Sequence, residues 1–98
     1  MFTGTLALDL RLGDVHSLKE KRSVVRPILS DLKKRFDVTA AEAGHADLHR
    51  RSLIGVAVVA DASAHCVEVL AAAERAVAER PDVEVLSART RLYSLEDE

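Results

Sequence analysis

Four leucines spaced two residues apart constrain the fold of this chain more than any other feature. They lie within residues 5–12 and are Leu6, Leu8, Leu10 and Leu12. Thr5, Ala7, Asp9 and Arg11 occupy the positions between them. A period of two is typical of a β-strand with one buried face and one exposed face. The segment therefore predicts a first strand that contributes its leucines to a core.

A helix is predicted directly after this strand. Ser17, followed three positions later by Glu20, forms a capping box, which is a signature of a helix start. The expected core stripe recurs at helical spacing and consists of Leu18, Val25, Leu29, Leu32 and Phe36. Pro27 removes a backbone donor and clashes with the preceding turn. We expect one helix kinked at Pro27, and a helix that restarts near Arg26 is the alternative.

Residues 37–43 and 53–60 predict two further strands, joined by a polar connection over residues 44–51. The second of these strands has no clean alternation, so we expect both of its faces to be covered. A second helix, capped by Asp61 or Ser63, should end near Arg80 because Pro81 prevents its continuation. Its expected core stripe is Cys66, Leu70, Ala73 and Val77.

Residues 82–93 predict a fourth strand whose alternation slips near Leu86 and Ser87, which indicates a bulge. The acidic tail, residues 96–98, is expected to fray. The order strand, helix, strand, strand, helix, strand is that of the ferredoxin-like split β-α-β fold of the α+β class. We therefore expect a four-stranded antiparallel sheet with two helices on one face. The 98 residues are expected to form a single domain over residues 1–98.

The composition excludes several classes of site. Cys66 is the only cysteine, which rules out an intrachain disulfide and cysteine-based metal sites and fits a reducing cytoplasm. The longest apolar stretch, residues 53–60, is far shorter than the roughly 20 residues of a membrane-spanning helix. No N-terminal leader is recognisable. We expect a cytoplasmic protein that is neither exported nor inserted in a membrane, and no cofactor, because so small a core leaves no enclosed cavity.

The chain resembles the YlxP-like family, also known as DUF503, in three stretches: HSLKEKRSVVRPILSDLKKRF, VTAAEAGHADLHRRSLIGVAVVA and RPDVEV. The resemblance implies a ferredoxin-like fold. It also implies a gene found among those for translation initiation and ribosome maturation, such as ribosome-binding factor A. It brings no established activity and no catalytic residue. One departure is His49, where relatives often carry a tryptophan.

Charge is distributed unevenly along the chain. Residues 11–36 contain eight Lys or Arg against three acidic residues, whereas residues 61–84 contain two against six. Helical geometry places Lys19, Arg22, Arg26, Lys33 and Lys34 on one flank of the first helix. Such a field suits contact with phosphates. A flank that is only solvated is the alternative.

We expect contact with RNA backbone or a ribosome-associated protein through this flank and the connection that follows the second strand. The expected binding residues are Lys19, Lys21, Arg22, Arg26, Lys33, His45, Asp47, Arg50 and Arg51. His45, Asp47 and His49 would point the same way in an extended segment, but nothing else completes a metal site, so no metal is expected. Stacking aromatics are missing from the third strand, which disfavours base reading on the sheet.

The outer face of the sheet is expected to be an oligomer interface. Small or apolar residues should line it: Thr5, Ala7, Leu53, Gly55, Ala57 and Val59. Left exposed, they would form an apolar patch, and a dimer or higher oligomer would bury it.

The leading hypothesis is a small non-enzymatic module that acts with the translation or ribosome-assembly machinery. Two other classes stay open. One is an oligomeric, ligand-sensing regulatory domain of the same fold. The other is an enzyme whose reactive residues do not form a recognisable set.

Overall fold

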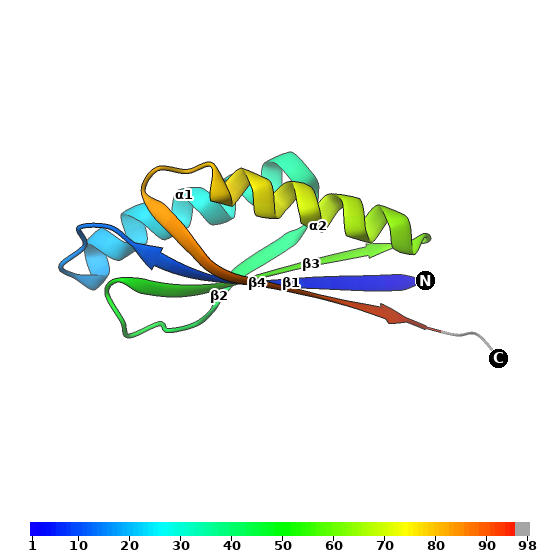
Figure 1. Ribbon diagram of the computed structural model, residues 1–98, viewed down its shortest axis with the longest axis horizontal. Coiled ribbons are helices and arrows are strands. Elements are labelled where there is room, and N and C mark those ends of the chain that lie inside the picture. Colours follow the sequence, from blue (N-terminus) through cyan, green and yellow to red (C-terminus); the bar gives the residue numbers. More distant parts are fainter. Residues whose placement is uncertain (96–98) are drawn as a thin grey trace.

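The computed structural model describes residues 1–95, so the expected fraying of residues 96–98 lies outside the described residues. The elements are β1 (Phe2–Leu12), α1 (Leu18–Phe36), β2 (Thr39–Gly44), β3 (Arg51–Ala60), α2 (Ser63–Ala78) and β4 (Val83–Ser94). The strands form one antiparallel sheet in the order β2-β3-β1-β4. Both helices lie on the same face of this sheet (Figure 1). This is the predicted ferredoxin-like α+β arrangement.

β1 is central in the sheet and carries the middle of the core. It begins at Phe2, three residues before the predicted start, and pairs with β3 on one side and β4 on the other. Its four alternating leucines are all at most 1% exposed. The buried face of β3, which includes Ile54 and Val56, continues this layer. The predicted one-sided strand is confirmed.

α1 runs as one helix through Pro27, so the alternative with a second helix start is wrong. The hydroxyl of Ser17 accepts a hydrogen bond from the Glu20 amide at 3.1 Å. The Glu20 carboxylate accepts from the amide of His16 at 2.8 Å instead of completing the box at Ser17. The helix ends at Asp37 in the left-handed region with φ 53°, which delays the start of β2 to Thr39.

The buried stripe of α1 differs from the predicted one. The buried residues are Lys21, Val25, Ile28 and Leu32. Leu18 is 36% exposed, and Leu29 and Phe36 are only half-buried. The apolar residues of α1 spread over a sector wider than the contact with the sheet. The helix is therefore rotated so that Leu18 and Leu29 lie at the border of the core.

The core stripe of α2 is confirmed, because Cys66, Leu70, Ala73 and Val77 are its buried residues. Its expected cap is wrong: Ala62 occupies the N-cap position, and no side chain caps the helix. Asp9 pairs with Ser87 while Leu10 pairs with Val85. One residue of β4, Leu86, is therefore extra, which confirms the predicted bulge.

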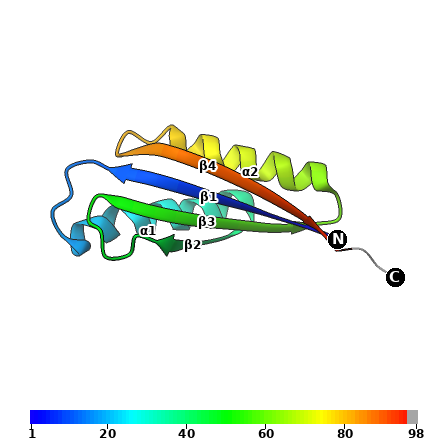
Figure 2. The ribbon, with the colours of Figure 1, turned by 60° about the horizontal axis from the view of Figure 1, so that its bottom comes forward.

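The second face of the sheet bears no helix (Figure 2). Within residues 1–95, the helices therefore cover one face of β3 and leave its other face open. Neither helix of residues 1–95 combines the length and the hydrophobicity that crossing a membrane requires.

Candidate functional site

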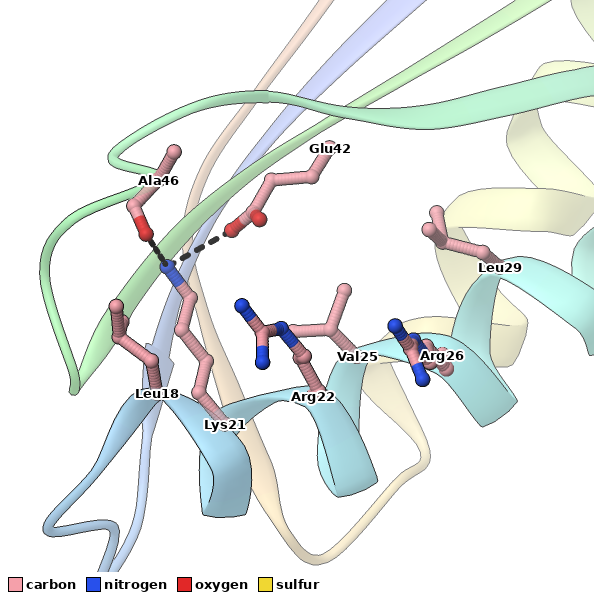
Figure 3. A pocket seen from close by; sticks show the side chains of 8 residues that line it. All are labelled: Leu18, Lys21, Arg22, Val25, Arg26, Leu29, Glu42 and Ala46. Atoms are coloured by element: carbon pink, nitrogen blue, oxygen red, sulfur yellow. Dashed lines mark hydrogen bonds and ion pairs between the residues drawn. The ribbon is translucent and has the colours of Figure 1, made fainter.

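A groove of about 310 Å³ lies between α1 and the β2 edge of the sheet (Figure 3). We call it the α1–β2 groove. Its lining residues are Leu18, Lys21, Arg22, Val25, Arg26, Leu29, Glu42 and Ala46. The rotation of α1 explains its apolar wall, because it leaves Leu18 and Leu29 beside the core and not within it. The groove thus combines an apolar wall with two guanidinium groups and a carboxylate.

Lys21 lies at the inner end of this groove and is only 2% exposed. Its Nζ atom lies 2.8 Å from Oε2 of Glu42 and donates a hydrogen bond of 2.6 Å to the carbonyl of His45. The expectation that Lys21 is a surface binding residue is therefore wrong. Its ammonium group fastens α1 to β2 and to the start of the following connection.

Glu42 was missed by the sequence analysis. Its Oε2 also accepts a hydrogen bond of 2.7 Å from the hydroxyl of Ser52 on β3. Its Oε1 accepts no hydrogen bond from any residue among 1–95. A single glutamate in a short edge strand carries no local signal of such a role, since both of its partners come from other elements.

Besides Arg35, five exposed cations lie along α1, and we call them the basic flank: Lys19, Arg22, Arg26, Lys33 and Lys34. None of them forms an ion pair within the described part of the chain. The acidic residues of α1 are engaged elsewhere, because the Glu20 carboxylate accepts from the His16 amide and Asp31 pairs with Arg35 at 3.2 Å. The positive charge of the flank is therefore not compensated locally.

The connection between β2 and β3 is a turn and not an extended segment. His45 has φ 59°, and its carbonyl accepts a hydrogen bond of 3.0 Å from the Leu48 amide. Asp47 and His49 are exposed and do not line up with His45 as an extended chain would place them. Residues 1–95 contain no group of three potential metal ligands.

Arg50 and Arg51 do not extend the basic flank. Arg51 lies on the outer sheet face and holds both carboxylate oxygens of Asp9, at 2.8 and 2.7 Å. The Nε of Arg50 donates to the carbonyl of Gly13 at 2.8 Å. Neither residue lines the α1–β2 groove. The charge of Arg51 is therefore neutralised by Asp9, and Arg50 is held at the Gly13 carbonyl outside the α1–β2 groove.

A cluster of Asp9, Arg51 and His45 joins β1, β3 and the turn after β2. The hydrogen bond from Arg51, aided by its charge and that of His45, holds the pKa of Asp9 below its usual value despite partial burial. Nε2 of His45 lies 3.6 Å from a carboxylate oxygen of Asp9. The carbonyl of His45 thus accepts from Lys21, and its ring lies beside Asp9.

The predicted interface residues lie together on the outer sheet face. Pairing places Thr5 beside Ala57 and Ala7 beside Gly55, and Val59 is 63% exposed. Sequence analysis missed their neighbours on β4, which are Arg89, Arg91 and Tyr93. All three are exposed. Their spacing of two residues indicates that they share one face of β4. The bulge at Leu86 shifts the register, so the sequence alone did not show that this is the outer face.

Comparison with known proteins gives two matches. The family model described as "Protein of unknown function (DUF503)" matches residues 3–90. A relative from Bacillus subtilis (strain 168), described as uncharacterized protein YlxP, is 39% identical over 49 residues. That match covers 50% of this chain and 53% of the relative, so it spans about half of each protein.

Proposed function

The chain belongs to the DUF503 family, and we propose that it is a small, non-enzymatic cytoplasmic module that acts with the translation or ribosome-assembly machinery by contacting RNA backbone. One observation carries this proposal. The five cations of the basic flank are exposed on one helix and have no ion-pair partner among residues 1–95.

The geometry of the flank suits a phosphate chain. From Lys19 to Lys33 the helix rises by about 21 Å, at 1.5 Å per residue. A strand that follows this surface meets several cations in succession. Each contact neutralises a phosphate and releases condensed counterions, which favours binding at low salt. Contacts of this kind position a nucleic acid without reading its sequence.

The charge of the rest of the chain orients this contact. The net charge is −2, and the acidic excess lies in residues 61–84, which include α2. A polyanion is therefore attracted to α1 and repelled from α2. Electrostatic asymmetry of this kind guides a partner toward one surface of a protein whose overall charge is close to neutral.

The test is the salt dependence of binding to ribosomal particles and to single-stranded RNA. The double variant Arg22→Gln with Arg26→Gln should bind more weakly, and its log-log salt slope should be flatter by about 1.4, or 0.7 for each phosphate contact. The matched control, Glu68→Gln with Glu79→Gln, removes two exposed charges from α2 and its end. It should leave the salt slope unchanged.

An unchanged slope in the double arginine variant, or no binding by the parent at low salt, contradicts the proposal. A second outcome would also change the proposal. If a ribosome-associated protein recovered from host cells stays bound to this chain after RNase treatment, the partner is that protein and not RNA.

We also propose that the outer sheet face is a homo-oligomer interface. Thr5, Ala7, Gly55 and Ala57 form a shallow apolar trough there with Thr39 and Ala41. Small side chains leave a flat surface that a second sheet approaches closely. Burial of apolar surface contributes about 25 cal/mol for each Å², and a second copy presents the same surface.

A further inference from the structure

The α1–β2 groove differs from the rest of the basic flank in having an apolar wall. Leu18, Val25 and Leu29 supply this wall, and the guanidinium groups of Arg22 and Arg26 lie beside it (Figure 3). Its volume of about 310 Å³ is near the lower limit of ligand sites, which hold about 300 to 1,000 Å³. The groove therefore suits one planar ring system with apolar faces, next to an anionic group held by arginine.

The polar floor of the groove restricts which ring system fits. Oε2 of Glu42 is occupied by Lys21 at 2.8 Å and by the Ser52 hydroxyl at 2.7 Å. Both oxygens of a carboxylate accept hydrogen bonds, and no residue among 1–95 donates one to Oε1. The side chain is 27% exposed, which leaves this oxygen accessible to a bound molecule. A matching ligand must present a hydrogen-bond donor, such as an amino group, and no carbonyl at this point.

Among the nucleobases, cytosine, adenine and guanine carry an exocyclic amino group that donates to a carboxylate. Uracil lacks this group, and its one ring N–H is flanked by two carbonyl oxygens, which a carboxylate repels. In a duplex the same edges are used in pairing, and the base faces are stacked. Unpaired bases in single strands, in contrast, expose both faces and edges.

We propose that the α1–β2 groove receives an unpaired, amino-bearing nucleobase between α1 and β2, with its amino group on Oε1 of Glu42 and its flanking phosphates on Arg22 and Arg26. This inference rests on the proposed RNA contact. It adds to that contact a preference for single-stranded RNA and for cytosine over uracil, which phosphate binding alone does not produce.

The sharpest probe is a pair of RNA octamers, oligocytidine and oligouridine, because the two pyrimidines differ mainly at this edge. Fluorescence anisotropy at one salt concentration should show about tenfold tighter binding of oligocytidine, as one hydrogen bond to a charged group provides. A blunt RNA duplex of the same charge should bind no better than oligouridine. Glu42→Gln, which turns the site into a mixed donor and acceptor, should reduce the cytidine preference to less than about twofold.

A second variant tests the proposal independently if Glu42→Gln does not fold. Ala46 is exposed and lines the groove, so Ala46→Trp should fill it without disturbing the core. This variant should lose the preference for oligocytidine and keep its salt-dependent binding. Ala64→Trp, at an exposed position of α2, is the matched control and should keep the preference.

The two proposals fail differently. Equal binding of both octamers, with the salt slope intact, overturns the base-binding groove and leaves the phosphate contact standing. A preference that survives in Ala46→Trp also overturns it. Absence of binding to either octamer at low salt overturns the proposed function itself.

Discussion

The ammonium group of Lys21 on α1 lies 2.8 Å from a carboxylate oxygen of Glu42 on β2. This contact crosses from the helix layer to the edge of the sheet. A lysine this deeply buried is tolerated because Glu42 pairs with its charge and because the His45 carbonyl accepts a hydrogen bond from its Nζ atom. The same contact holds Glu42 at the α1–β2 groove, so one ion pair serves both the fold and the candidate site.

Replacing Lys21 by methionine should destabilise the protein. The change removes the ion-pair partner of Glu42 and the donor to the His45 carbonyl, and the loss should be about 2 kcal/mol, less than for a fully buried pair because Glu42 reaches solvent. Urea denaturation measures this change. Lys19→Met, at an exposed position of the same helix, should alter stability by no more than about 0.5 kcal/mol. Equal stability of both variants would show that the ion pair contributes nothing.

The Asp9–Arg51 pair should make stability depend on acidity. Arg51 lowers the pKa of Asp9 in the folded protein, so the unfolded chain takes up the proton first as the pH falls. The stabilisation is fully present above the unfolded pKa of roughly 4 and is lost as the pH falls through the folded pKa. Asp9→Asn should therefore be less stable than the parent at pH 7. The melting temperatures of the parent and of Asp9→Asn should converge toward pH 2. A difference in melting temperature that stays constant from pH 7 to pH 2 would argue against this role.

Gly4 should not accept a side chain. A Cβ atom built there would lie 2.8 Å from Cδ1 of Leu70 and 3.2 Å from Cβ of Cys66. Gly4→Ala should therefore cost about 1 to 3 kcal/mol through overpacking between β1 and α2. At Gly13 the nearest atom would be 3.9 Å away, at the Asp82 carbonyl. Gly13→Ala should be neutral or slightly stabilising in thermal melts, and a neutral Gly4→Ala would mean that the Leu70 side chain moves aside without cost.

Val59→Lys should dissociate the proposed oligomer, because it places a charge in the outer sheet face where a second copy would pack. Light scattering at tens of micromolar should report an oligomer for the parent and a monomer for this variant. Val67 is comparably exposed on α2, away from that face, and Val67→Lys should leave the mass unchanged. A monomeric parent would refute the interface.

Metal should have no part in folding. Within residues 1–95, no three potential ligands come together, and the turn at His45 separates the side chains that an extended segment would have aligned. The melting temperature should be the same with and without EDTA. A large decrease on adding the chelator would reveal a site that these residues do not suggest.

Patterns within single elements determined much of this fold. The leucines of β1 and the stripe of α2 follow the periods of a strand and a helix, so their buried faces could be predicted without knowing their partners. The bulge at Leu86 was also visible as a break in a local period. In each case the information lies within a few neighbouring residues.

The candidate site depended on contacts between distant segments. The apolar sector of α1 is wide, and only its packing on the sheet decided that Ile28 is buried while Leu29 lines the groove. Lys21 resembles its solvated neighbours in the sequence. It is buried because β2 supplies a carboxylate and the turn after β2 supplies a carbonyl. Local periodicity determined the elements and their order, whereas charge pairing across layers depends on tertiary proximity, which no local pattern records.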